Sequence, residues 1–205
     1  MIELINIVFQ LIIFILLFSV GNFSVFSKKN TFELVDINYE ILSKNIIVQL
    51  NFILFLSFFN LSLDKIIYSY LISLIVFLLI NLRYFFSYKQ ILNIKVFFLF
   101  FICLLIFFNI SFNLTLSWDT EKFWFQKVLN FYNGNSIDNL TNTNRSYNPY
   151  LGDLIWAFFW KLSLISEEYS GRLFYGFFYI VSISLLVSNL KTKHIYKFII
   201  ILLII

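Results

Sequence analysis

The sequence predicts an all-α fold: a multi-pass bundle of transmembrane helices with interfacial amphipathic helices in one long outer loop. Hydrophobic residues make up 60% of the 205 residues and the mean hydropathy is +0.87, whereas about 45–50% of the residues of a soluble domain are apolar. The apolar residues also form runs that approach or exceed the roughly 17–25 residues with which a helix crosses a bilayer. A chain of this length cannot bury so much apolar surface in its own core, so we expect lipid to cover part of it.

Five runs are long enough to form complete spans, and a sixth begins near the end of the sequence. The predicted spans are 4–26, 46–63, 66–82, 96–116 and 173–190. The sixth run, 198–205, would reach only about 12 Å as a helix, against roughly 30 Å of hydrocarbon. We therefore expect the sequence to be the N-terminal part of a longer protein, with a three-span region at 1–95 and a second region at 96–205.

The basic residues of the short loops predict the orientation of these spans. If the spans alternate in direction, most of the basic residues outside 115–172 fall in loops on one side of the membrane: Lys28, Lys29, Lys44, Arg83, Lys89, Lys95, Lys191, Lys193 and Lys197. The short loop on the opposite side has only Lys65. Because Lys and Arg are enriched in cytoplasmic loops, we expect an integral protein of the plasma (inner) membrane, with the N-terminus and residues 115–172 outside.

Residues 115–172, which we call the polar segment, differ from the rest of the chain and are where chemistry is expected. They contain all four tryptophans and the only proline. Residues 118–132 have polar and aromatic side chains on opposite faces of a helix, which favours a helix in the plane of the membrane interface. An Asn-Gly-Asn sequence at 133–135 should end it, and a second helix is expected at 153–165.

Several side chains of the polar segment have both a structural and a functional interpretation. Trp156 and Trp160 lie one helical turn apart, as expected of an aromatic belt at the interface. Arg145 is either a solvated side chain or a phosphate ligand. Glu168 and Arg172 have the i,i+4 spacing of a helix-surface ion pair, which stabilises by a few tenths of a kcal/mol. The helix at 118–132 could likewise be only a surface anchor.

The order of these features resembles the GT-C superfamily of polyprenyl-phosphate-dependent glycosyltransferases, in particular the branch of protein mannosyltransferases and lipid A aminoarabinose transferases. The matching stretches are Trp118-Asp119, residues 147–152 with Trp156, and residues 168–173. The resemblance covers 96–190. The chain departs from the family in its Asn-Pro-Tyr sequence at 148–150, in three additional early spans, and in lacking most of the later spans.

The resemblance implies transfer of a sugar from a polyprenyl-phosphate donor to an acceptor glycan, lipid or protein at the outer face of the bilayer. It assigns the catalytic carboxylates to Asp119 and Glu121, with Asp119 either deprotonating the acceptor hydroxyl or binding a divalent cation. The cations available for the donor phosphate are four side chains of the polar segment: Lys122, Lys127, Arg145 and Arg172.

Other functions compete with this interpretation. A non-catalytic multi-pass membrane protein would need none of these side chains. A transporter-like bundle usually has ionisable or Gly/Pro-broken segments at mid-membrane, and the spans show no clear mid-span charge and no proline. Nucleic acid is not an expected partner, because the basic residues cluster at span ends rather than along a binding motif. The sequence therefore favours an enzyme over a transporter.

Overall fold

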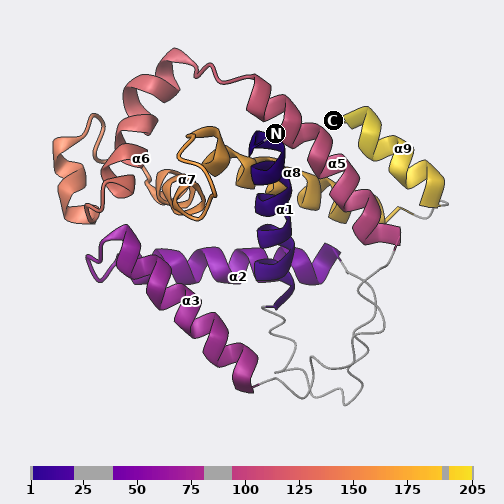
Figure 1. Ribbon diagram of the computed structural model, residues 1–205, viewed down its shortest axis with the longest axis horizontal. Coiled ribbons are helices and arrows are strands. Elements are labelled where there is room, and N and C mark those ends of the chain that lie inside the picture. Colours follow the sequence, from indigo (N-terminus) through magenta and orange to yellow (C-terminus); the bar gives the residue numbers. More distant parts are fainter. Residues whose placement is uncertain (1, 21–38, 81–93, 191–193, 205) are drawn as a thin grey trace.

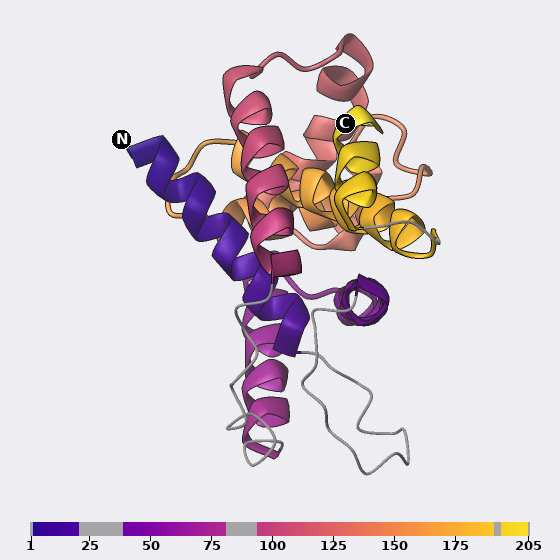
Figure 2. The same ribbon diagram turned by 90° about the vertical axis from the view of Figure 1, so that its right-hand side faces the viewer.

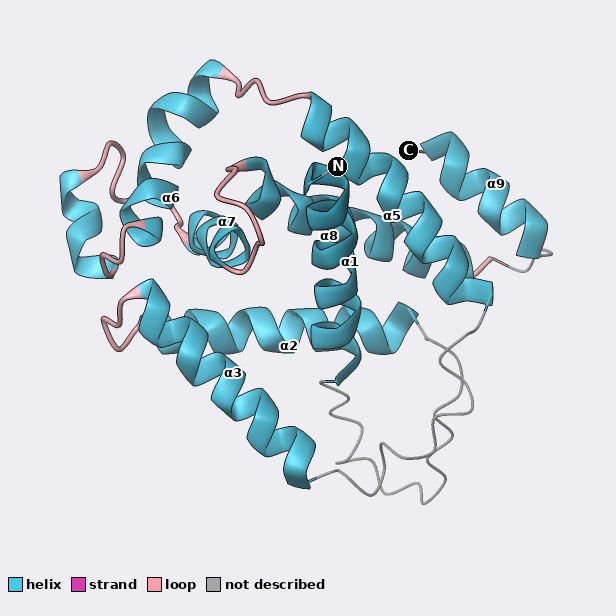
Figure 3. Ribbon diagram, viewed as in Figure 1, coloured by secondary structure: helices cyan, strands magenta, loops and turns pink. Residues whose placement is uncertain are grey.

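The computed structural model describes residues 2–20, 39–80, 94–190 and 194–204, and within these ranges all regular structure is helical (Figures 1 and 3). This confirms the all-α class. The α-helices are α1 (Ile2–Val20), α2 (Tyr39–Ser57), α3 (Leu63–Ile80), α5 (Ile94–Phe112), α6 (Phe125–Tyr132), α7 (Leu151–Lys161), α8 (Tyr169–Ser188) and α9 (His194–Ile204). A π-helical turn, η2 (Thr120–Trp124), leads into α6, and a 3-10 helix, η3 (Ile137–Asn142), comes after it.

Each predicted span overlaps one of these helices, but the lengths differ. Two of the described helices, α3 and α8, are both long and apolar enough to cross a membrane by length and composition. The apolar stretches found in α1, α2 and α5 are shorter, at Ile2–Phe18, Leu42–Ser57 and Phe98–Phe112. Residues 21–26 and 81–82 of the predicted spans lie outside the described residues.

The predicted break between the second and third spans was at Asp64 and Lys65, and this prediction is wrong. The break lies at 58–62, where Asn60 adopts the left-handed conformation (φ 54°). Asn tolerates this conformation better than most residues, and it stops the preceding helix. Asp64 is instead in the first turn of α3, where a carboxylate interacts favourably with the helix dipole.

Helix α8 lies at the centre of the fold and packs against α1, α2, α5 and α7. Figure 1 shows α1 and α5 in front of α8. In Figure 2, α2 is seen end-on and α3 is seen along its length, so α2 and α3 cross rather than lie parallel. Aromatic rings fill the contact: Phe159 of α7 stacks on Phe174 of α8 with centroids 4.6 Å apart. Phe14 of α1 meets both rings edge-on. Helices from both predicted regions of the chain thus share one core.

Two distant parts of the chain hold the polar segment in place. Near the N-terminus, Asn6 of α1 donates a hydrogen bond to Ser170 (3.0 Å) and accepts one from the backbone N–H of Leu164 (3.1 Å). The first turn of α3 contributes an ion pair from Asp64 to Lys161 (2.7 Å), and Asn60 of the preceding turn donates a hydrogen bond to Asp138. The start of α1, the α2–α3 turn and the polar segment are therefore neighbours in the fold.

Candidate functional site

The first helix of the polar segment is present over residues 118–132, as predicted, but it contains the π-helical turn η2. Such a turn inserts one extra residue and rotates the helical faces of the residues after it. Val128 and Lys127 point inward and are fully buried, while Asp119 and Lys122 are exposed. The helix ends at Tyr132, and Gly134 just beyond it has a φ of +86°, the left-handed conformation expected from the Asn-Gly-Asn sequence.

The second helix, α7, ends at Lys161 rather than at 165. Its C-terminal turn is closed by local hydrogen bonds, since Ser163 donates to the carbonyl of Trp160 (2.7 Å) and the Trp160 indole donates to the carbonyl of Ser166 (2.9 Å). Trp156 and Trp160 do not form an exposed belt. Both are buried by protein, and Trp160 stacks on Tyr132 with ring centroids 3.9 Å apart.

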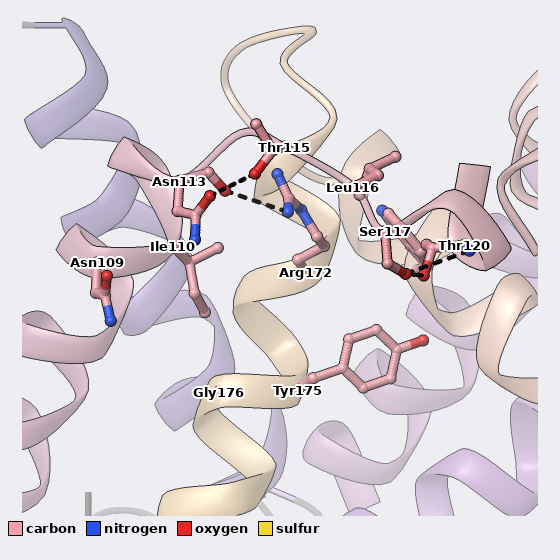
Figure 4. Close-up of a pocket in the computed structure, with 11 residues that line it drawn as sticks. Asn109, Ile110, Asn113, Thr115, Leu116, Ser117, Thr120, Arg172, Tyr175 and Gly176 are labelled. Carbon is pink, nitrogen blue, oxygen red and sulfur yellow. Dashed lines mark hydrogen bonds between the residues drawn. The ribbon is translucent and has the colours of Figure 1, made fainter.

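A pocket of about 420 Å³ lies where the end of α5, the following loop, η2 and the first turns of α8 meet (Figure 4). Most of the polar side chains come from α5 and the loop after it, and α8 and α7 provide the aromatic and cationic ones. The lining residues are Asn109, Ile110, Asn113, Thr115, Leu116, Ser117, Thr120, Trp156, Arg172, Tyr175 and Gly176. They include one cation and no carboxylate.

Arg172 is the charged group of this pocket, and its side chain is only 16% exposed. Its Nε lies 3.0 Å from Oε1 of Glu168, which confirms the predicted i,i+4 ion pair. The geometry of this contact is not that of a hydrogen bond, and Nη2 of Arg172 is buried without a hydrogen-bond partner. Nη1 donates to the carbonyl of Asn113 at 3.4 Å. The guanidinium is thus held by Glu168 and Asn113 and keeps donors for a further acceptor.

The electrostatics of Glu168 agree with this arrangement. Burial raises the pKa of the Glu168 carboxyl, and the neighbouring guanidinium of Arg172 acts in the opposite direction. The ion pair is therefore partly desolvated. Removal of either partner would leave a buried charge without its counter-charge, which is costly.

The structure does not bring the four predicted phosphate-binding cations together. Lys122 is exposed and outside the pocket lining. Lys127 is fully buried, and its ammonium donates to the carbonyl of Asn148 at 3.1 Å. The guanidinium of Arg145 lies 3.8 Å from the centroid of the Phe123 ring. Of the four, Arg172 alone lines the pocket.

The two predicted catalytic carboxylates are beside the pocket rather than in its lining. Asp119 and Glu121 are both exposed. Asp119 lies in sequence between Ser117 and Thr120, two lining residues whose hydroxyls are 2.7 Å apart. Within the described part of the chain, no three His, Cys, Asp or Glu side chains are grouped as metal ligands. The divalent cation at Asp119 stays a prediction.

A different carboxylate, Asp153, has the more unusual environment. It is 4% exposed in the first turn of α7, and its Oδ2 has no hydrogen-bond partner. Burial raises the pKa of Asp153 to about 7, and the positive charge of Lys127 opposes that shift. Burial in turn lowers the pKa of Lys127. No sequence pattern indicated this pair, because an Asp in the first turn of a helix is common.

Tyr175 was also missed, because it lies inside a predicted span. It follows Arg172 by three residues on α8, so the two side chains share a helix face. Its hydroxyl donates to the carbonyl of Gly152 at 2.5 Å.

In comparisons of the chain with known proteins, no family model, no curated protein and no solved structure matches the chain.

Proposed function

We propose that this protein is a multi-pass membrane glycosyltransferase that moves a sugar from a polyprenyl-phosphate donor to an acceptor at the outer face of the plasma membrane. The observation that carries the proposal is the position of Arg172 in the pocket, with a donor nitrogen buried and unpaired. Guanidinium groups suit phosphate oxygens because of their planar fork of donors. Arg172 is also one of the four cations that the GT-C resemblance makes available for the donor phosphate.

The arrangement of the helices supports a membrane location and the predicted orientation. The second half of α3 exposes apolar side chains, including Ile72, Leu79 and Ile80. Lipid would cover them. The start of α1, the α2–α3 turn and the polar segment are neighbours, and these are the three parts for which the loop charges predict an outer location. The pocket then opens near the outer ends of α5 and α8.

The proposed chemistry divides between the pocket and its edge. A sugar linked to a lipid phosphate is already activated, so transfer needs stabilisation of the leaving phosphate and removal of a proton from the acceptor hydroxyl. Arg172 performs the first task. Asp119 performs the second or binds a divalent cation, and Glu121 is the nearby second carboxylate. The exposure of both carboxylates makes them accessible to an acceptor arriving from water.

The test is sugar transfer from a polyprenyl-phosphate donor in proteoliposomes, with the rate expressed per folded molecule. Arg172→Gln should lower the rate by about 10²-fold, the effect of losing one electrostatic stabiliser of the transition state. Glu168→Gln is the matched control, because it removes the same ion pair and leaves the cation. It should retain most of the rate.

Two results would contradict the proposal. If the two variants lose the same amount of activity per folded molecule, Arg172 acts only through the ion pair. If Asp119→Asn transfers sugar at the parental rate, rather than about 10²–10⁴-fold more slowly, Asp119 is not the base and the helix at 118–132 is an anchor.

A further inference from the structure

The pocket has an aromatic wall that phosphate binding does not use. Tyr175 is 37% exposed although it lies on a largely buried helix. In Figure 4 its ring projects from α8 one turn after Arg172, toward the hydroxyls of Ser117 and Thr120. Phosphate alone would contact Arg172 and leave this ring exposed.

The ring is fixed before any ligand arrives. The ring is attached to α8 at one end, and at the other end its hydroxyl donates a hydrogen bond to the carbonyl of Gly152. Trp156 meets it edge-on, with centroids 6.5 Å apart and planes at 86°. A ring held in this way loses little conformational freedom when a ligand packs on it, which favours binding.

The small polar side chains of the pocket lining are alcohols and amides, and they lie beside the apolar side chains of Ile110 and Leu116. Ser117 and Thr120 share a hydrogen bond, and Asn113 accepts one from Thr115. Each of these groups keeps further donor or acceptor capacity that the hydroxyls of a ligand can use, and a cationic ligand would find no carboxylate among the lining residues. A ligand that satisfies all of them has an apolar face, several hydroxyls and a negative charge.

We propose that the pocket binds the sugar ring together with its phosphate, with Tyr175 as the platform for the ring and Arg172 as the partner of the phosphate. The C–H face of a hexose packs on the electron-rich face of the tyrosine ring, and its hydroxyls meet the alcohols and amides opposite. The volume of about 420 Å³ is in the range of small-molecule sites. This inference rests on the proposed function and adds the residue that selects the sugar.

The experiment measures binding to the full chain in nanodiscs by titration calorimetry, with inorganic phosphate, a hexose 1-phosphate and a short prenyl-phosphate hexose as probes. The parent should bind hexose 1-phosphate about tenfold more tightly than phosphate. Tyr175→Leu should lose that difference and still bind phosphate. Tyr175→Phe should keep it, because it has the ring and lacks only the hydrogen bond to Gly152.

The outcomes separate this inference from the proposed function. Parental preference for hexose 1-phosphate in Tyr175→Leu, or no preference in the parent, overturns the role of Tyr175. A loss of preference in both Tyr175 variants overturns it too, since the lost hydrogen bond would then explain the effect. Phosphate binding that Arg172→Gln does not weaken counts against the proposed function. Equal affinity for the soluble and prenyl-linked hexose phosphates supports the ring platform and contradicts a lipid-linked donor.

Discussion

Helices α3 and α8 have similar length and apolar composition, yet their surroundings are opposite. The buried residues of α8 are spread along the helix from Tyr169 to Val187, whereas those of α3 end at Tyr70. Helices of similar apolar composition therefore differ in one chain: protein covers most of α8, whereas most of the apolar surface of α3 is exposed. Length and hydropathy alone do not distinguish a core helix from a lipid-facing one, and the exposure of the side chains does.

The tight packing of α8 can be broken at Gly171, with the largest expected effect. A Cβ at this position would lie 2.3 Å from the carbonyl oxygen of Trp156 and 2.5 Å from its Cδ1. Gly171→Ala should therefore separate α7 from α8, at a cost above the about 1–3 kcal/mol usual for overpacking. The yield of folded protein after detergent extraction should fall to near zero. Gly152→Ala is the control, because its Cβ meets only the Tyr175 hydroxyl, at 3.6 Å. Normal folding of Gly171→Ala would show that α7 and α8 can move apart freely.

The exposed face of α3 provides the second test. Ile72 is 60% exposed near the middle of the helix. In lipid, Ile72→Lys should cost about 2.5–3.5 kcal/mol and reduce the fraction of chains inserted in microsomes. On a surface facing water, the same substitution should be nearly neutral. Phe58→Lys in the α2–α3 turn, where Phe58 is similarly exposed, should insert normally. Equal insertion of the two variants would contradict a membrane location for α3.

The buried surroundings of α8 extend to Asp153, and pH should reveal them with a smaller effect. Its pKa of about 7 in the folded chain lies above the ordinary value of 3.8, so between these values the folded chain binds more protons than the unfolded one. The free energy of unfolding should then fall as pH rises from 5 to 7, by at most about 1.4 kcal/mol per pH unit from this group.

Asp153→Asn should remove that part of the pH dependence, so its Tm should exceed the parental Tm at pH 8 by more than at pH 5. Thermal unfolding in detergent at both values measures this difference. Glu121→Gln, which removes an exposed carboxylate and leaves the surroundings of Asp153 unchanged, is the control for the loss of one negative charge. If the stability of Asp153→Asn changes with pH as steeply as that of the parent, water reaches the Asp153 carboxyl.

The sequence predicted the helical class and the approximate position of each long helix, because apolar runs dominate it. It misplaced the break between α2 and α3, because Asn60 and Ser62 are single polar residues among apolar ones, and hydropathy does not reveal the left-handed conformation of Asn60. The burial of Lys127 was not predictable either, since the π-helical turn at Thr120–Trp124 departs from the 3.6-residue period on which helical faces are assigned.

The pocket was predictable only in part. Arg172 was one of four candidate cations, and its spacing from Glu168 predicted only the ion pair. Tyr175 was hidden, because an aromatic residue within an apolar run is most often a buried or lipid-facing one. Ser117 and Thr120 join the pocket only through the path of the loop after α5, and no local pattern encodes that path.

The contacts that hold the polar segment also constrain how the chain is made. Asn6 pairs with Ser170, 164 residues later, and Asp64 pairs with Lys161, 97 residues later. During synthesis α1 emerges long before Leu164 and Ser170, the partners of Asn6, are made. Until then the Asn6 amide lacks its native hydrogen bonds. Contacts so distant in sequence form late and slowly. The early helices should therefore depend on chaperones until α8 is complete, and nascent chains arrested before residue 164 should be the most readily degraded.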